Sequence, residues 1–150
     1  MKVWISARAR ASAICALTLL SASCAPAAKP EVGMLKQGVA ALSITPITWN
    51  VVGLDSNDVT AGPNLFPVGA RVTNTGDAPA TNVAATFTFT SANALINLGS
   101  SPVLTEASLA PGASRDFYFD VVVTRNAAAY DTARSYTITA TADLVPPVST

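Results

Sequence analysis

Three oxygen-bearing side chains in one short stretch are the first candidates for chemistry in this chain of 150 residues. Asp55, Asn57 and Asp58 fall in a segment rich in Asn, Asp, Gly and Pro. Calcium takes about six to eight oxygen ligands, so the cluster is a candidate calcium site. Its spacing differs from that of an EF-hand loop, and no Glu lies nearby to bind as a bidentate ligand. The same residues also fit a surface loop closed by Asx turns, in which case the protein holds no metal and no cofactor.

Side chains suited to acid–base or nucleophilic catalysis are sparse. The sequence contains no His, which excludes a Ser–His–Asp triad, a Cys–His pair and a His metal ligand. Asp116 and Asp120 are the candidates for a glycosidase carboxylate pair, but no pocket-forming loop accompanies them. We therefore expect no catalytic residue and no enzymatic activity.

Charge and composition narrow the classes of partner. Lys and Arg number 9, Asp and Glu also number 9, and charged residues make up 12% of the chain. The usual share is about 25%. Because there is no basic excess to displace counterions from phosphates, we expect no nucleic-acid binding. Low charge with ample Val, Ile, Leu and Phe is also the opposite of the composition of disordered chains.

The N-terminal residues have the pattern of an export signal. Lys2, Arg8 and Arg10 precede an uncharged run over residues 11–20, and small residues follow it. This order predicts a signal-peptide helix within residues 1–27. A membrane-spanning helix needs about 20 strongly apolar residues, and the Ala and Ser here are too mild for that. An uncleaved N-terminal anchor is the alternative.

Two processing sites compete within this segment. Ala25 and Ala27 place small residues at positions −3 and −1 of one cleavage site. Residues 21–24 resemble a bacterial lipobox with Ser in place of the usual Leu, which makes Cys24 a candidate for lipidation. Either route exports the protein to the cell surface or the medium, or alternatively leaves it periplasmic or lipid-anchored. Membrane contact is expected only through the signal peptide or that lipid.

Removal of the leader leaves a domain without cysteine. Both Cys, at positions 15 and 24, lie in residues 1–27. The remaining 123 residues carry 6 basic and 9 acidic side chains, for a net charge of −3. No disulfide can form within them, so the core must stabilise the domain alone. A chain of this size buries about two-thirds of its surface, which suffices.

Most of the mature chain has the period of two that is typical of half-buried strands. Residues 28–42 form a linker or tail, and the sandwich is expected over 43–145. Pro146 and Pro147 place a stiff tail over 146–150. About seven short strands separated by turns indicate an all-β, antiparallel two-sheet β-sandwich. The alternating segments are 47–51, 68–73, 83–90, 117–124 and 136–143, with weaker ones at 95–98 and 103–109.

Four residues are expected to shape turns between these strands. Asn74 is placed to cap its own turn, and Gly76 to adopt a left-handed backbone conformation that a side chain would penalise by roughly 1 kcal/mol. Pro111 and Gly112 fit the two central positions of a type II turn.

The segments Val72–Val83 and Leu109–Ser114, with Phe117–Thr124 after them, resemble a known family. They are similar to the strand–turn–strand signatures of the cell-adhesion-related domain of bacteria (CARDB-like) and related surface repeats. The resemblance covers roughly residues 49–143. It implies an immunoglobulin-like sandwich in an extracellular setting and carries no catalytic residue. Such modules usually occur in tandem, whereas this chain contains one.

The function expected from these features is structural or adhesive. The leading interpretation is a non-enzymatic, exported β-sandwich module at a bacterial cell surface, with an unidentified protein or glycan as its partner. A secreted or periplasmic calcium- or carbohydrate-binding module is one alternative, and an accessory domain of a larger hydrolase is another. Tyr118 falls on the polar phase of its strand and is a candidate exposed contact residue.

Overall fold

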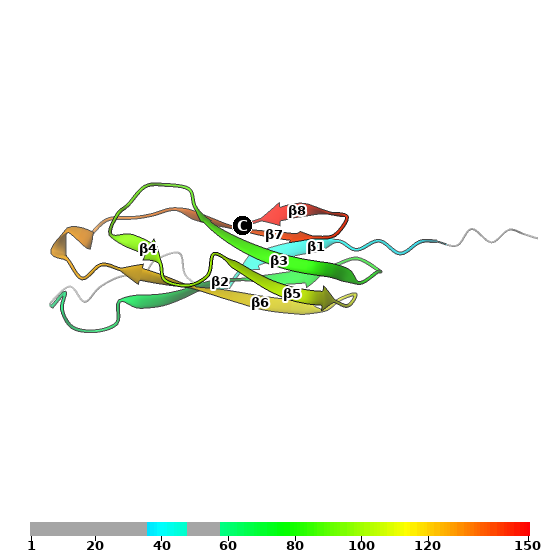
Figure 1. Ribbon diagram of the computed structural model, residues 1–150, viewed down its shortest axis with the longest axis horizontal. Coiled ribbons are helices and arrows are strands. Elements are labelled where there is room, and N and C mark those ends of the chain that lie inside the picture. The colour runs from blue at the N-terminus through cyan, green and yellow to red at the C-terminus, as the bar shows by residue number, and fades with distance from the viewer. Residues whose placement is uncertain (1–35, 48–57) are drawn as a thin grey trace, which may run out of the picture. The chain divides into compact units, whose positions relative to one another are not determined.

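The chain folds as a two-layered β-sandwich. The computed structural model describes residues 36–47 and 58–150, which lie in one compact unit, Lys36–Thr150. Within these residues, eight strands form two four-stranded antiparallel sheets (Figure 1). The strands are β1 (Leu42–Pro46), β2 (Leu65–Asn74), β3 (Ala80–Phe89), β4 (Ile96–Leu98), β5 (Val103–Leu109), β6 (Ser114–Val123), β7 (Tyr136–Ala142) and β8 (Val145–Ser149). A short 3-10 helix, η1 (Ala127–Ala129), precedes β7.

The two sheets are built from strands that are far apart in sequence. The first sheet has the order β1-β2-β6-β4 and the second has the order β5-β3-β7-β8. The chain therefore crosses between sheets after β2, β3, β4, β5 and β6, and consecutive strands share a sheet only at β1–β2 and β7–β8. β2 and β6 are the central strands of the first sheet, and they pair over nearly their full lengths.

The alternation seen in the sequence is the alternation of burial. On β2, Val68, Ala70 and Val72 are at most 2% exposed, whereas Arg71 between them faces solvent. Successive side chains of a strand point to opposite faces, so one phase of each strand fills the space between the sheets. The strands predicted within 68–73, 83–90, 117–124 and 136–143 are confirmed. So are the weaker ones at 95–98 and 103–109.

Aromatic rings link the two layers towards the end of the sandwich that holds the start of β7. Phe87 of β3 lies 5.4 Å from the ring centroid of Phe119 on β6, in the opposite sheet. It also stacks on Tyr136 at 5.1 Å and meets Phe89 edge-on at 4.9 Å. Offset and edge-to-face pairs of this kind add about 0.5–1.5 kcal/mol each beyond their buried area. The cluster therefore couples β3, β6 and β7.

The structure differs from the sequence prediction at both borders of the sandwich. β1 begins at Leu42, inside the stretch expected to be a linker. The residues expected as a tail, 146–150, form most of β8, which pairs with β7. Pro146 and Pro147 are tolerated there because β8 is an edge strand and they coincide with a break in register. The strand predicted over 47–51, with Trp49, lies almost wholly outside the described residues.

The turns gather at the two ends of the sandwich. The connections that follow β2, β5 and β7 lie together at one end, and η1 lies at the other (Figure 1). Residues 39–41 run beside the turn after β2, where Asp77 N donates to Val39 O at 3.0 Å and Thr75 N donates to Ala41 O at 2.8 Å. The chain thus enters the sandwich at the end that holds these turns.

Candidate functional site

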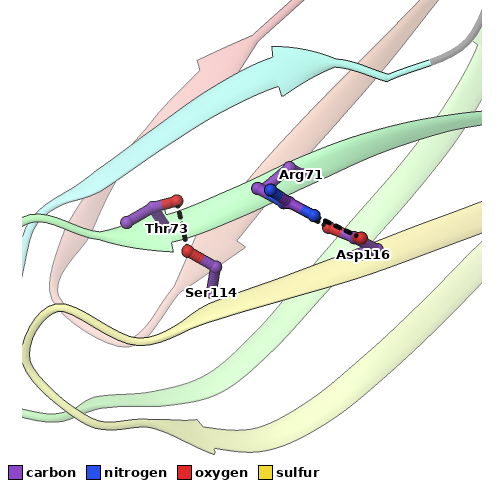
Figure 2. Close-up of polar contacts among 4 residues, drawn as sticks. All are labelled: Arg71, Thr73, Ser114 and Asp116. Atoms are coloured by element: carbon purple, nitrogen blue, oxygen red, sulfur yellow. Dashed lines mark hydrogen bonds and ion pairs between the residues drawn. The ribbon is translucent and has the colours of Figure 1, made fainter.

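The outward surface of β2 and β6 holds a group of polar and aromatic side chains that is a candidate contact site. We call it the Tyr118 face, and it consists of Arg71, Thr73, Ser114, Asp116 and Tyr118. These residues occupy the polar phase of strands whose other phase is buried. Cross-strand register brings Arg71 opposite Asp116 and Thr73 opposite Ser114. Figure 2 shows these two pairs side by side on the sheet.

Arg71 and Asp116 form a bidentate ion pair on this face. Arg71 Nε donates to Asp116 Oδ1 at 2.7 Å, and Nη2 donates to Oδ2 at 2.8 Å (Figure 2). The hydrogen bond from Arg71 lowers the pKa of Asp116, and the same bond raises the pKa of Arg71. Both groups therefore stay charged at neutral pH. The planar fork fixes the position of each side chain.

Tyr118 lies beside this ion pair and leans across β2. Its side chain is half exposed, at 51%. Tyr118 pairs with Gly69, and a Cβ at Gly69 would lie 2.8 Å from Tyr118 Cδ1 and 3.2 Å from Cε1. The absence of a side chain at Gly69 thus gives the ring its place against the backbone of β2. The expectation that Tyr118 is an exposed aromatic agrees with this exposure.

The surface around the pair is hollowed and has balanced charge. A depression of about 430 Å³ is lined by Arg71, Ser114, Arg115, Asp116 and Tyr118. Arg115 Nε lies 3.3 Å from Glu106 Oε2, so each of the two guanidinium groups in the depression has its own carboxylate partner. Thr73 Oγ1 and Ser114 Oγ are hydrogen-bonded to each other at 2.7 Å. The site therefore offers several hydrogen-bonding groups without a net charge.

A second cavity lies at the end of the sandwich that holds the start of β7. It measures about 450 Å³, and Phe89, Ile96, Val121 and Tyr136 contribute apolar walls. Arg134 also lines it, with its guanidinium carbon 3.7 Å from the centroid of the Phe89 ring. The same guanidinium donates to the carbonyl oxygens of Ser91 and Ile96. Arg134 thus joins the loop after β3 to the segment before β7 through these hydrogen bonds.

The structure describes one of the three calcium candidates. Asp58 Oδ1 accepts hydrogen bonds from Thr60 N at 2.8 Å and Thr60 Oγ1 at 2.6 Å, which is an Asx turn. The bond from the Thr60 hydroxyl is the main cause of a lowered pKa at Asp58. Asp55 and Asn57 lie outside the described residues. Among the residues that are described, no group of three His, Cys, Asp or Glu is placed to hold a metal ion.

The guanidinium group of Arg125 binds the backbone of the loop after Asp58. Arg125 Nη1 donates to Thr60 O at 2.8 Å and to Ala61 O at 2.7 Å, and Nη2 donates to Gly62 O. Convergent carbonyl oxygens are ligands that calcium also uses. In this loop they surround a guanidinium supplied by the segment after β6.

The two predicted turns differ in why they need glycine. Gly112 has φ of +75°, and Ala113 N donates to Ala110 O at 3.0 Å, as in a type II turn with Pro111 before it. Gly76 is not among the residues with positive φ, so the expected left-handed conformation was wrong. A Cβ at Gly76 would instead collide with Val39 O and lie 2.6 Å from Ala41 N. Close backbone approach, and not φ, requires glycine at that position.

Asn74 is the buried polar residue of this turn, with 0% exposure. Its Oδ1 accepts from Gly76 N at 3.0 Å and from Ala41 N at 3.4 Å. Its Nδ2 donates to Ala78 O at 2.8 Å and to Leu109 O at 2.9 Å. Asn74 therefore caps its own turn and also joins β2 of the first sheet to β5 of the second.

The predicted leader lies outside the described residues, and with it Cys24 and both candidate cleavage sites. In the described part of the chain, no helix is long and apolar enough to cross a bilayer. Sequence reasoning did not single out Arg71, Arg125 or Arg134. The available signal was weak, because an isolated Arg on a polar phase or in a loop looks like an ordinary solvated residue.

No family model matches the chain, and no curated protein is significantly similar to it.

Proposed function

We propose that the protein is a non-enzymatic, exported β-sandwich that acts as a structural or adhesive module at a bacterial cell surface. Its contact surface in this proposal is the Tyr118 face. The observation that carries the proposal is the half-exposed Tyr118 ring beside the fixed Arg71–Asp116 pair. Exposed aromatic and Arg side chains are enriched where proteins meet their partners.

An immunoglobulin-like arrangement is part of the proposal. The strand order supports it, because β3 and β7 form the centre of one sheet while β1, β2 and β6 are neighbours in the other. In immunoglobulin-like sandwiches the second and third strands likewise belong to different sheets. The resemblance of Val72–Val83 to bacterial surface modules points in the same direction.

Export is supported by the sequence of the leader. The basic start, the uncharged run and the small residues around Ala27 or Cys24 are the features that secretion machinery reads. A domain without cysteine does not need a disulfide to fold, so it is compatible with any extracytoplasmic compartment. The calcium-binding alternative is less well supported, because Asp58 serves Thr60 and the nearby carbonyls serve Arg125.

Two measurements on cells test the proposal. A protease added to intact cells should degrade the protein while a cytoplasmic marker survives, and cells that lack the protein should attach less well to a glycoprotein-coated surface. Protein that survives protease until the cells are lysed would contradict a surface role. The variant Cys24→Ser separates the two processing routes, since release from the membrane fraction is expected only if Cys24 carries a lipid.

A further inference from the structure

We infer that the Tyr118 face is a binding site for an uncharged pyranose sugar within a glycan. The Tyr118 ring is the stacking platform, and the Arg71–Asp116 pair is the hydrogen-bonding edge. This inference rests on the proposed function, because it names the class of partner for the surface assigned there. Three properties of the site lead to it, namely an apolar ring surface, fixed polar groups beside it and zero net charge.

The apolar part of the site is the exposed side of the Tyr118 ring. One face of a pyranose ring carries mainly C–H groups, and it gains free energy when it leaves water for an apolar surface. Gly69 lets the Tyr118 ring lean over β2, with Cδ1 and Cε1 close to its backbone. Because an aromatic ring has few rotatable bonds, holding it in this place costs little conformational entropy on binding.

The polar part of the site supplies both donors and acceptors. Arg71 uses Nε and Nη2 in the ion pair, and among the described residues Nη1 makes no further hydrogen bond. The Asp116 carboxylate accepts one bond at each oxygen and has lone pairs left for sugar hydroxyls. Both groups are already fixed by their mutual bonds, so a ligand would not have to order them.

Charge balance favours a neutral ligand over an anionic one. A phosphate or sulfate ester is recognised by cations that remain unpaired or that form forks with the anion itself. In the depression, Arg71 is already paired with Asp116, and Arg115 is paired with Glu106. An anion would have to displace a carboxylate or lie next to one. Sugar hydroxyls avoid that repulsion.

The size of the site suits a single sugar ring with its neighbours extending over the sheet. The depression of about 430 Å³ is open to solvent, so it can contact one side of a sugar ring and leave the other side exposed. Its lining residues lie on β2 and β6, near the end of the first sheet that holds the turn before β6, and Figure 2 shows Ser114 at the start of β6. A linear glycan can therefore lie along the surface without entering the sandwich.

Tyrosine signals give a direct test on the full chain, which contains three tyrosines. With tyrosine rings isotopically labelled, cellotetraose or the N-acetylglucosamine tetramer at millimolar concentration should shift the Tyr118 resonances alone. Tyr130 and Tyr136 are internal controls. Because Tyr136 borders the cavity at the end of the sandwich, a shift confined to Tyr136 would place the sugar there and overturn the inference.

Variants test the role of the Tyr118 ring. Tyr118→Ala should weaken binding at least about tenfold, as removal of a central aromatic contact does. Tyr118→Phe should bind nearly as well as the wild type, because the ring remains. Val103→Ala, which shortens an exposed side chain on the other sheet, should leave binding unchanged. Equal binding by Tyr118→Ala and the wild type would overturn the inference.

Two further outcomes also decide the question. Absence of any Tyr118 shift with both neutral probes, or stronger binding of a sulfated oligosaccharide than of cellotetraose, would overturn the sugar site. Neither result would disprove a surface location. Conversely, a protein that binds cellotetraose through Tyr118 but remains inside the cell would contradict the proposed function and leave the sugar site standing.

Discussion

Asn74 shows how a single buried polar residue can hold two sheets together. Its amide group bonds to the segment before β1, to its own turn and to the last residue of β5. Each buried donor or acceptor that loses its partner costs about 1–3 kcal/mol. The residue is therefore more important for folding than its place in a turn suggests.

We expect Asn74→Ala to lower the free energy of unfolding by about 2–4 kcal/mol, because the Leu109 carbonyl and the Gly76 N–H lose buried partners. Asn74→Asp should also destabilise, since a carboxylate cannot donate to Ala78 and Leu109. Urea unfolding with an unchanged m-value is the measurement. The exposed Asn97 serves as the matched control, and a loss in Asn97→Ala as large as in Asn74→Ala would contradict the interpretation.

Arg125 leads to a prediction about metal dependence. Since its guanidinium already satisfies the carbonyls of Thr60, Ala61 and Gly62, neither a chelator nor added calcium should change the melting temperature. Arg125→Ala should lower the free energy of unfolding by about 1–2 kcal/mol, and Arg125→Lys should lower it less because one charge remains. Differential scanning calorimetry provides the comparison. A clear drop in Tm of the wild type on addition of chelator would contradict this prediction, because it would show that the native state binds a metal ion.

At the scale of elements, the strands that were predictable are those with one face in the core. β2, β3, β6 and β7 each place alternate apolar residues between the sheets, so burial leaves its period in the sequence. β1 and β8 are short edge strands with little alternation, and the two prolines in β8 read as a tail.

The candidate site was predictable only in part for a related reason. The phase of β6 shows that Tyr118 faces outward, and no long-range knowledge is needed for that. The Arg71–Asp116 pair joins residues 45 positions apart, and it depends on the register between β2 and β6. A single sequence does not reveal that register. The same holds for Arg125 and the loop that it completes.

The β7–β8 turn contains a residue in an unfavourable conformation. Leu144 has φ of +57°, and its side chain is fully exposed. The left-handed region costs an ordinary residue roughly 1 kcal/mol, and Asn tolerates it better. We expect Leu144→Asn to raise the free energy of unfolding by about 0.5–1 kcal/mol. Leu144→Ala should have little effect, because it removes no buried surface and keeps the strain. Equal stabilisation by both variants in urea unfolding would contradict a backbone origin.

At the scale of the molecule, the residues that stabilise the fold are distinct from those of the proposed binding surface. The apolar core between the sheets and the hub at Asn74 hold the fold. The chain enters at the end of the sandwich that holds the turns (Figure 1). The Tyr118 face lies on the outer side of the first sheet, where its residues contribute little to the core. A substitution on the Tyr118 face is therefore expected to cost less stability than one between the sheets.

The carboxylates predict how the whole molecule responds to acid. Hydrogen bonds from Thr60, Val39 and Arg71 respectively lower the pKa of Asp58, Asp77 and Asp116 below the ordinary value of 3.8. At pH values around and below 3.8, the native state therefore binds fewer protons than the unfolded state. Their contribution to stability is complete above pH 3.8, and it is lost as the pH falls through the lowered pKa values.

We thus expect the free energy of unfolding to show no histidine-dependent change between about pH 5 and 8, because the chain has no His, and to fall in stronger acid. Asp116→Asn should make that fall shallower, since the variant has one fewer carboxylate whose pKa is lowered in the native state. Urea unfolding over a pH series measures both curves. If the wild type and Asp116→Asn lost stability with the same slope, protonation of Asp116 would not be coupled to unfolding, and the Arg71–Asp116 pair would contribute nothing to the response to acid.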